Sequence, residues 1–185
     1  PTVVKVCTED GMVGYGETDA WACFSAETPE TVAAVLKNYL APSILGEDAS
    51  NVIKIHETLG FAMRENHMAK GTIDMACYDL LGKEAGMPVF RLLGGSLYDS
   101  LPIMGALGGE TAEEAAKAAL ENKAKGYHSV MVKVGRDPVK DAECVLAVRD
   151  AVGRDYPLVL DANQGWDLAS AKKFISIAKE ADPVL

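Results

Sequence analysis

A lysine and an aspartate stand at the ends of two short apolar runs, and both residue types can do chemistry. Lys133 ends the run Ser-Val-Met-Val-Lys, and Asp161 ends the run Leu-Val-Leu-Asp. A lysine amine can transfer protons, and a carboxylate oxygen is the kind of ligand that Mg²⁺ prefers. The pair therefore indicates either proton-transfer chemistry beside a divalent cation or an ion pair that only fills the interior of the fold.

Side chains alternate between the two faces of a strand, and this alternation sets where the charges point. Val130 and Val132 share the face opposite Lys133, and in the second run Asp161 and Asn163 share one face. We expect the valines to lie under helices and the polar side chains to point into a barrel, where catalytic groups gather at the C-terminal ends of strands. Asp161 alone cannot hold Mg²⁺, so later strands would have to supply further oxygen ligands.

Strands and helices alternate from residue 101 to the end of the chain. The expected strands cover 101–107, 129–134 and 158–162. Helices are expected after the capping residues Thr111, Asp137 and Asp167. Strand–helix repeats of this length predict parallel βαβ units with right-handed crossovers. They suit the first three units of a (β/α)8 TIM barrel, which needs roughly 250 residues in total.

Residues 1–100 follow a different rhythm and predict an α+β domain. Strands are expected at 2–7 and 12–17, and helices at 28–40, 51–63 and 70–85. We therefore expect two domains, 1–100 and 101–185. The chain opens at Pro1 inside a strand-like run and stops as a new apolar run begins. We expect both ends to be cut and the start of the N-terminal strand to be missing.

The composition excludes several classes of protein. The 185 residues include 18 Lys and Arg against 27 Asp and Glu, a net charge of −9, and 49% are hydrophobic. Such a chain can bury enough apolar surface to fold, and its acidic balance argues against a nucleic-acid partner. It contains no stretch of about 18 uncharged apolar residues, so no membrane span is expected. The four cysteines form no CxxC pair, which favours a reducing, cytoplasmic location.

Several motifs resemble those of the mandelate racemase/muconate lactonizing enzyme family of the enolase superfamily. In the C-terminal half they are VKVG at 132–135 and LDANQGW at 160–166. In the N-terminal half they are GYGE at 14–17, APSILG at 41–46, and the stretches 69–83 and 87–95. These motifs occur in the family's order along nearly the whole chain. The resemblance implies an α/β protein with an α+β capping domain followed by the first three βα units of a TIM barrel.

The resemblance also implies roles for three residues. Lys133 matches the second lysine of the family's KxK motif, the residue that moves a proton α to a carboxylate. Asp161 matches the first of three carboxylate ligands for Mg²⁺ or Mn²⁺, and Asn163 is similar to a polar position near the metal and the substrate. One residue departs from the pattern: Met131 stands where the motif has its first lysine, which points to a substrate other than muconate.

The resemblance places residues 18–27 in a capping loop that closes over the substrate. Trp21 and Phe24 would then be substrate contacts, although local packing explains them equally well. The implied function is metal-dependent proton abstraction α to a carboxylate with enediolate stabilisation, of the muconate cycloisomerase kind. The alternatives are a racemase or epimerase, an acid-sugar dehydratase, or a non-catalytic, incomplete fragment. We expect a homo-oligomer that binds a small carboxylate substrate.

Overall fold

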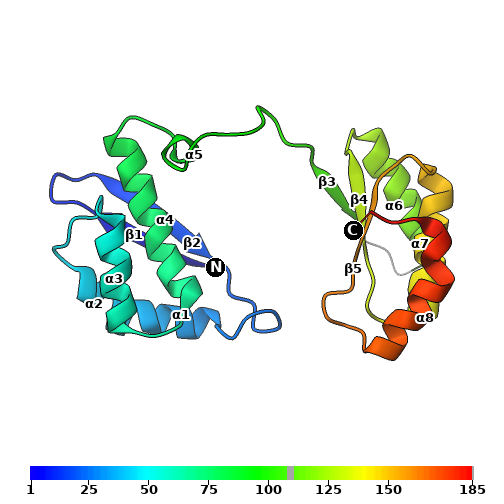
Figure 1. Cartoon of the computed structure of the whole chain (residues 1–185), viewed down its shortest axis with the longest axis horizontal. Coiled ribbons are helices and arrows are strands. Elements are labelled where there is room, and N and C mark those ends of the chain that lie inside the picture. The colour runs from blue at the N-terminus through cyan, green and yellow to red at the C-terminus, as the bar shows by residue number, and fades with distance from the viewer. Residues whose placement is uncertain (108–110, 185) are drawn as a thin grey trace. The chain divides into compact units, whose positions relative to one another are not determined.

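Two compact units make up the computed structural model, which describes residues 1–107 and 111–184 (Figure 1). The N-terminal unit covers Pro1–Leu97, and the C-terminal unit covers Tyr98–Leu185. The first combines a β-hairpin with helices, and the second combines a parallel sheet with helices. Each unit has a hydrophobic core of its own.

A close contact between a helix and a hairpin organises the N-terminal unit. Strands β1 (Thr2–Cys7) and β2 (Val13–Thr18) pair antiparallel, and helix α4 (His67–Glu84) packs against β2. The approach is possible because β2 has glycine where it meets the helix: a Cβ at Gly16 would lie 1.8 Å from the Thr72 carbonyl oxygen. The glycines of the GYGE stretch therefore serve the packing of this unit.

The helix expected over 28–40 is less regular than the sequence predicts. It consists of α1 (Pro29–Val35), a π-helical turn (Leu36–Leu40) and α2 (Ala41–Ile44). Pro42 lies in α2, and because proline has no N–H it cannot donate to a preceding carbonyl, so the hydrogen-bond ladder is interrupted here. The other helices of the unit are α3 (Val52–Ala62) and α5 (Val89–Leu92).

Three parallel βα units form the C-terminal unit. The strands β3 (Met104–Leu107), β4 (Ser129–Lys133) and β5 (Leu158–Asp161) pair in the order β3-β4-β5. The helices α6 (Ala112–Ala124), α7 (Pro138–Val152) and α8 (Leu168–Ala178) line one side of this sheet (Figure 1). As predicted, Thr111, Asp137 and Asp167 cap these helices by accepting hydrogen bonds from amides of the first turn.

Strand β3 is shorter than the sequence predicts. The sequence predicts a strand from residue 101, but β3 begins at Met104. Its partner β4 begins at Ser129, directly opposite Met104, so the ladder offers no strand partner to Leu101 and Pro102. Both of these residues are exposed.

A buried arginine ties the C-terminal unit together. Arg149 on α7 is only 5% exposed, and its guanidinium donates to five backbone carbonyl oxygens. Those of Gly153 and Tyr156 lie in the connection from α7 to β5, each at 2.7 Å. That of Ala181 lies in the segment after α8, at 2.6 Å. Burial of a cation is unfavourable unless it is compensated, and here the dipoles of the five carbonyl groups compensate it.

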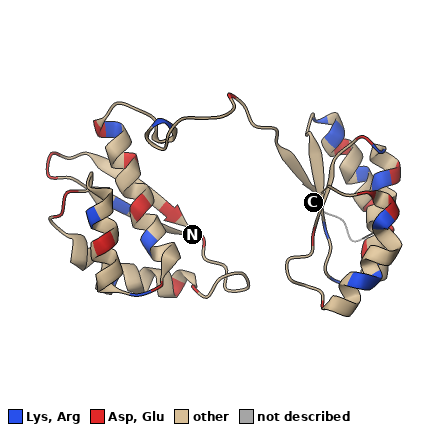
Figure 2. Ribbon diagram, viewed as in Figure 1, with Lys and Arg blue, Asp and Glu red and all other residues tan. Residues whose placement is uncertain are grey.

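Charged residues of both signs are interspersed along the helices of each unit (Figure 2). Apart from Arg149, no charged residue among those described is buried, as expected of amphipathic helices that cover a core. Within the described residues, no helix combines the length and the apolar character that crossing a membrane requires.

Replacing Gly16 by alanine should lower the free energy of unfolding of the N-terminal unit by about 2–3 kcal/mol, because the methyl group would collide with the backbone of α4. Gly60→Ala in α3 is the matched control. A Cβ at Gly60 meets no atom within 4 Å, so alanine should stabilise that helix by about 0.5–1 kcal/mol. Urea denaturation followed by circular dichroism measures both changes. Equal effects of the two substitutions would contradict the close-contact explanation.

Arg149→Met should lower the free energy of unfolding of the C-terminal unit by about 3 kcal/mol, because it leaves buried and partly buried carbonyl groups without this donor. Arg154→Met removes the same charge from an exposed side chain and should change this free energy by less than about 0.5 kcal/mol. Urea denaturation followed by the fluorescence of Trp166 in a Trp21→Phe background measures the difference. Similar losses in the two variants would show that Arg149 acts through net charge alone.

Candidate active site

Lys133 and Asp161 meet at the C-terminal ends of neighbouring strands. They are register partners in the parallel pairing of β4 with β5, and Lys133 Nζ donates to Asp161 Oδ2 at 2.6 Å. Val130 and Val132 are buried on the opposite face of β4, in the core that the sheet forms with its helices. The two charged side chains therefore project from the face of the sheet that the helices leave uncovered.

Asn163 joins this pair through its side chain and its backbone. Lys133 Nζ also donates to Asn163 Oδ1 at 2.8 Å, and the Asn163 N–H donates to Asp161 Oδ1 at 2.9 Å. Asn163 and Gln164 have φ angles of 44° and 64°, in the left-handed region that residues other than glycine rarely adopt. This turn folds the chain back directly after β5, and the Asn163 amide thereby reaches the lysine.

The hydrogen bonds within the cluster favour the ionised form of Asp161. The pKa of its carboxyl lies below the usual value, first because Lys133 hydrogen-bonds to it and second because the Asn163 backbone N–H does so. The side chains of Lys133 and Asp161 are 50% and 31% exposed. Within the described residues, the cluster is thus open to solvent.

Met131 occupies the same face of β4 as Lys133, one alternation earlier in the strand. It lies opposite Ala106 of β3 and Val159 of β5. A thioether brings no charge to this position, whereas the KxK pattern would place a second ammonium group there. Lys133 therefore has an apolar neighbour where the motif would give it a cationic one.

Asp141 supports the cluster and was missed by the sequence-based prediction. Its Oδ2 accepts hydrogen bonds from the backbone N–H groups of Gly135 and Arg136, at 3.0 and 2.8 Å. These bonds fix the loop that leaves β4 directly after Lys133. Asp141 lies in the first turn of α7, where an acidic residue is common simply because it interacts favourably with the helix dipole. The sequence therefore gives little sign of its contact with the loop.

The oxygen atoms of the cluster fit a hard divalent cation in kind but not in number. Asp161 offers a carboxylate and Asn163 an amide oxygen, which are ligand types that Mg²⁺ accepts. Across residues 1–107 and 111–184, no group of three or more His, Cys, Asp or Glu side chains is placed to hold a metal ion. Asp161 can therefore serve as one ligand, and the described residues alone do not complete a metal site.

Trp21 and Phe24 belong to the N-terminal unit, in the segment between β2 and α1. Their rings stack with centroids 6.1 Å apart, and the residues are 57% and 50% exposed. Lys133, Asp161 and Asn163 belong to the C-terminal unit. The structure thus brings three of the five predicted site residues into one cluster and pairs the other two as a separate feature.

Comparison with known families accounts for both units. Residues 2–94 match the N-terminal domain of mandelate racemase / muconate lactonizing enzymes, and residues 111–185 match an enolase C-terminal domain-like family. The chain belongs to the mandelate racemase/muconate lactonizing enzyme family. The predicted fold class is confirmed: an enolase-superfamily N-terminal domain is followed by the first βα units of the second domain.

Relatives in this family carry several activities. The chain is 35% identical to an N-succinyl-L-Arg/Lys racemase of Bacillus cereus, over 89% of this chain and 44% of that protein. It is 38% identical to a hydrophobic dipeptide epimerase of Enterococcus faecalis, over 94% of this chain and 48% of that protein. It is 33% identical to a chloromuconate cycloisomerase of Delftia acidovorans, over 97% and 50%. The chain therefore spans about half the length of the curated relatives it matches.

Solved structures show the same relationship. The crystal structure of the Bacillus cereus N-succinyl Arg/Lys racemase superimposes with a TM-score of 0.91 at 32% identity, over 98% of this chain and 49% of that chain. The Enterococcus faecalis dipeptide epimerase, complexed with Mg and the dipeptide L-Leu-L-Tyr, gives a TM-score of 0.86 at 36% identity, over 96% and 50%. Members of the enolase superfamily thus include isomerases, racemases and epimerases, and this dipeptide epimerase is among the structural neighbours that hold magnesium.

Removing the Lys133 amine should raise the pKa of Asp161 toward its usual range. Because this pKa is lowered in the folded chain, the pair stabilises the C-terminal unit above about pH 4, the value for an unfolded aspartate, and this contribution is lost as the pH falls through the lowered folded value. A ¹³C NMR titration of the metal-free protein measures the midpoint in Lys133→Met, with Lys140→Met as the control. A midpoint that Lys133→Met does not raise would contradict the assigned cause.

Proposed function

We propose that this chain carries the base of an enzyme that removes a proton α to a carboxylate, and that Lys133 Nζ is the atom that takes the proton. The observation that supports this most directly is the 2.6 Å contact between Lys133 and Asp161 at the C-terminal ends of adjacent parallel strands. In barrel enzymes this end of the strands carries the catalytic groups. The family's activities agree with the proposal.

The three clustered residues would divide the work between them. Lys133 accepts the proton as a neutral amine, and the ammonium group that results donates to the Asp161 and Asn163 oxygens. Asp161 is in addition the proposed ligand of Mg²⁺ or Mn²⁺, with the Asn163 oxygen beside it. A bound metal would stabilise the negative charge that develops on the substrate carboxylate as the proton leaves. That help is needed because a carbon acid α to a carboxylate is a very weak acid.

The proposed reaction is of the muconate cycloisomerase kind, and a racemase or epimerase is the second candidate. Chloromuconate cycloisomerases at 33% identity over 97% of the chain support the first candidate. Met131 in place of the first KxK lysine favours the second, together with racemase and epimerase relatives at 35% and 38% identity. A dehydratase is the third candidate, and a cis-3-hydroxy-L-proline dehydratase of Roseibium aggregatum is 34% identical.

The proposal also covers the substrate, the oligomeric state and the location of the enzyme. The substrate would be a small carboxylate, and Trp21 and Phe24 are proposed to contact it. Both rings are exposed and stacked, which gives an apolar surface that can adapt to different substrate side chains. We also propose a cytoplasmic homo-oligomer with no nucleic-acid partner, in keeping with the acidic composition.

Lys133→Ala should slow exchange of the substrate α-proton with D₂O by at least about a hundredfold while metal binding stays nearly unchanged. The assay uses the full natural polypeptide with Mg²⁺ and a panel of muconates, N-acyl amino acids and dipeptides. Proton NMR reports the exchange, and calorimetry reports the metal. Lys140→Ala removes an amine from the same unit and should leave the rate unchanged.

Two results would count against the proposal. Wild-type exchange in Lys133→Ala would remove Lys133 from the role of base. A wild-type polypeptide that binds no metal and exchanges no substrate proton would favour the alternative of a non-catalytic, incomplete fragment. The product formed by the active wild type distinguishes lactonization, racemisation or epimerisation, and dehydration.

A further inference from the structure

The segment at residues 19–28, between β2 and α1, carries two exposed aromatic rings on one turn. The N–H groups of Phe24 and Ser25 both donate to the Trp21 carbonyl oxygen at 2.9 Å. The turn sets the Trp21 and Phe24 rings side by side. Trp21 Nε1 donates to Asp19 Oδ2 at 2.7 Å, which orients the indole. Hydrogen bonds within the turn therefore hold its conformation. How the two rings are oriented relative to the rest of the unit depends on how the ends of the turn are attached.

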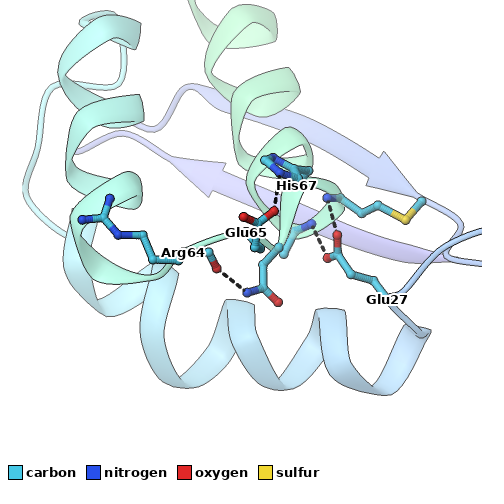
Figure 3. A network of polar contacts seen from close by, with 7 residues as sticks. Glu27, Arg64, Glu65 and His67 are labelled. Atoms are coloured by element: carbon cyan, nitrogen blue, oxygen red, sulfur yellow. Dashed lines mark hydrogen bonds and ion pairs between the residues drawn. The ribbon is translucent and has the colours of Figure 1, made fainter.

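Glu27 attaches the end of this segment to α4. Its Oε1 and Oε2 accept the backbone N–H groups of Met68 and Ala69, at 2.8 and 3.2 Å (Figure 3). These amides lie in the first turn of the helix, where they have no partner within the helix and where a negative charge is favoured. Ser25 Oγ donates to the Glu27 carbonyl oxygen at 2.7 Å. Both the side chain and the backbone of Glu27 are thus held.

The turn before α4 does not itself cap the helix, so the first backbone N–H groups of α4 can donate to Glu27. Glu65 and Asn66 adopt left-handed φ angles of 52° and 56°. The Asn66 side chain donates to the Arg64 carbonyl oxygen at 2.8 Å and does not cap the helix. The Glu65 carboxylate forms a hydrogen bond with the His67 ring, with Oε2 3.0 Å from Nε2 (Figure 3). The cap of the helix therefore comes from Glu27, a residue much earlier in the chain.

Helix α4 is a suitable anchor because the β-hairpin, α1 and α3 all contact it. It begins at His67, whereas the sequence predicts a start at residue 70, and the cap from Glu27 accounts for the longer N-terminal end. We propose that Glu27 is a positioning residue: by capping α4, it holds Trp21 and Phe24 in the orientation that meets the substrate. This inference rests on the proposed function, in which those two rings contact the substrate.

The first test of the contact between Glu27 and α4 is structural and uses substitutions at Glu27. Glu27→Ala should speed hydrogen exchange of the Met68 and Ala69 amides by about tenfold, and Glu27→Gln, which keeps one acceptor oxygen, should do so by less. The heteronuclear NOE of the Trp21 indole N–H should fall in both variants. Glu57→Gln on α3 makes the same charge change at an exposed position and should alter neither readout.

Kinetics on the full natural polypeptide then test the positioning role. Glu27→Ala should raise KM for the carboxylate substrate by about tenfold with kcat within about twofold, because the aromatic contacts contribute binding rather than proton transfer. Asn51→Ala is the control for lost helix capping. Asn51 Oδ1 caps α3 by accepting from the Lys54 N–H at 3.2 Å, so its loss destabilises the same unit without touching the 19–28 segment. Its KM should equal that of the wild type.

Three outcomes decide the inference. A raised KM in Glu27→Ala, with an unchanged KM in Asn51→Ala, supports it. Fast amide exchange with a wild-type KM overturns it, and so does a rise in KM that Asn51→Ala reproduces. Failure of the proposed function is distinguishable, because Lys133→Ala would then keep wild-type α-proton exchange whatever Glu27→Ala does to the amides and the indole. If Glu27→Ala does not fold, Glu27→Gln carries the same comparison.

Discussion

The guanidinium of Arg149 is the contact on which the geometry of the C-terminal unit depends. Its donors reach carbonyl groups in two places: the connection from α7 to β5 and the segment after α8. A planar group with five N–H bonds is suited to this, because it can satisfy several carbonyls at fixed angles without a carboxylate partner. Lys123 adds a related contact by donating to the Val152 carbonyl oxygen at 2.6 Å. The C-terminal end of α7 is thus held by two cations.

This arrangement bears on the candidate site because it sets where β5 begins. The carbonyls of Gly153 and Tyr156 that Arg149 holds lie just before Leu158, the first residue of β5. A shift of β5 by one residue would turn Asp161 to the helix-covered face, since side chains alternate along a strand. The meeting of Asp161 with Lys133 therefore depends on an arginine that takes no part in the cluster. Arg149 has a purely structural role, yet the proposed chemistry of Lys133 and Asp161 depends on it.

Local patterns carried most of what the sequence could predict. Alternation in β4 predicted the face of Lys133, and capping residues such as Thr111 and Asp137 predicted where helices begin. Arg149 and Glu27 were beyond such reasoning, because their partners are backbone groups that any residue could supply at that place in the fold. Backbone carbonyl and N–H groups occur in almost every residue, so the residue types do not show which of them will be a partner. The sequence therefore predicts the cluster on β4 and β5 better than the contacts that hold its surroundings.

The left-handed turn at Asn163 and Gln164 restricts which residue types fit close to Asp161 without backbone strain. A β-branched or bulky side chain in this conformation would be unfavourable by about 1–2 kcal/mol, whereas asparagine, aspartate and glycine tolerate it. This conformation thus favours asparagine, aspartate or glycine at position 163, whatever substrate is to be bound. Met131 sits in a regular strand and has no such restriction. Replacement of Met131 therefore meets no backbone obstacle, whereas most replacements of Asn163 do.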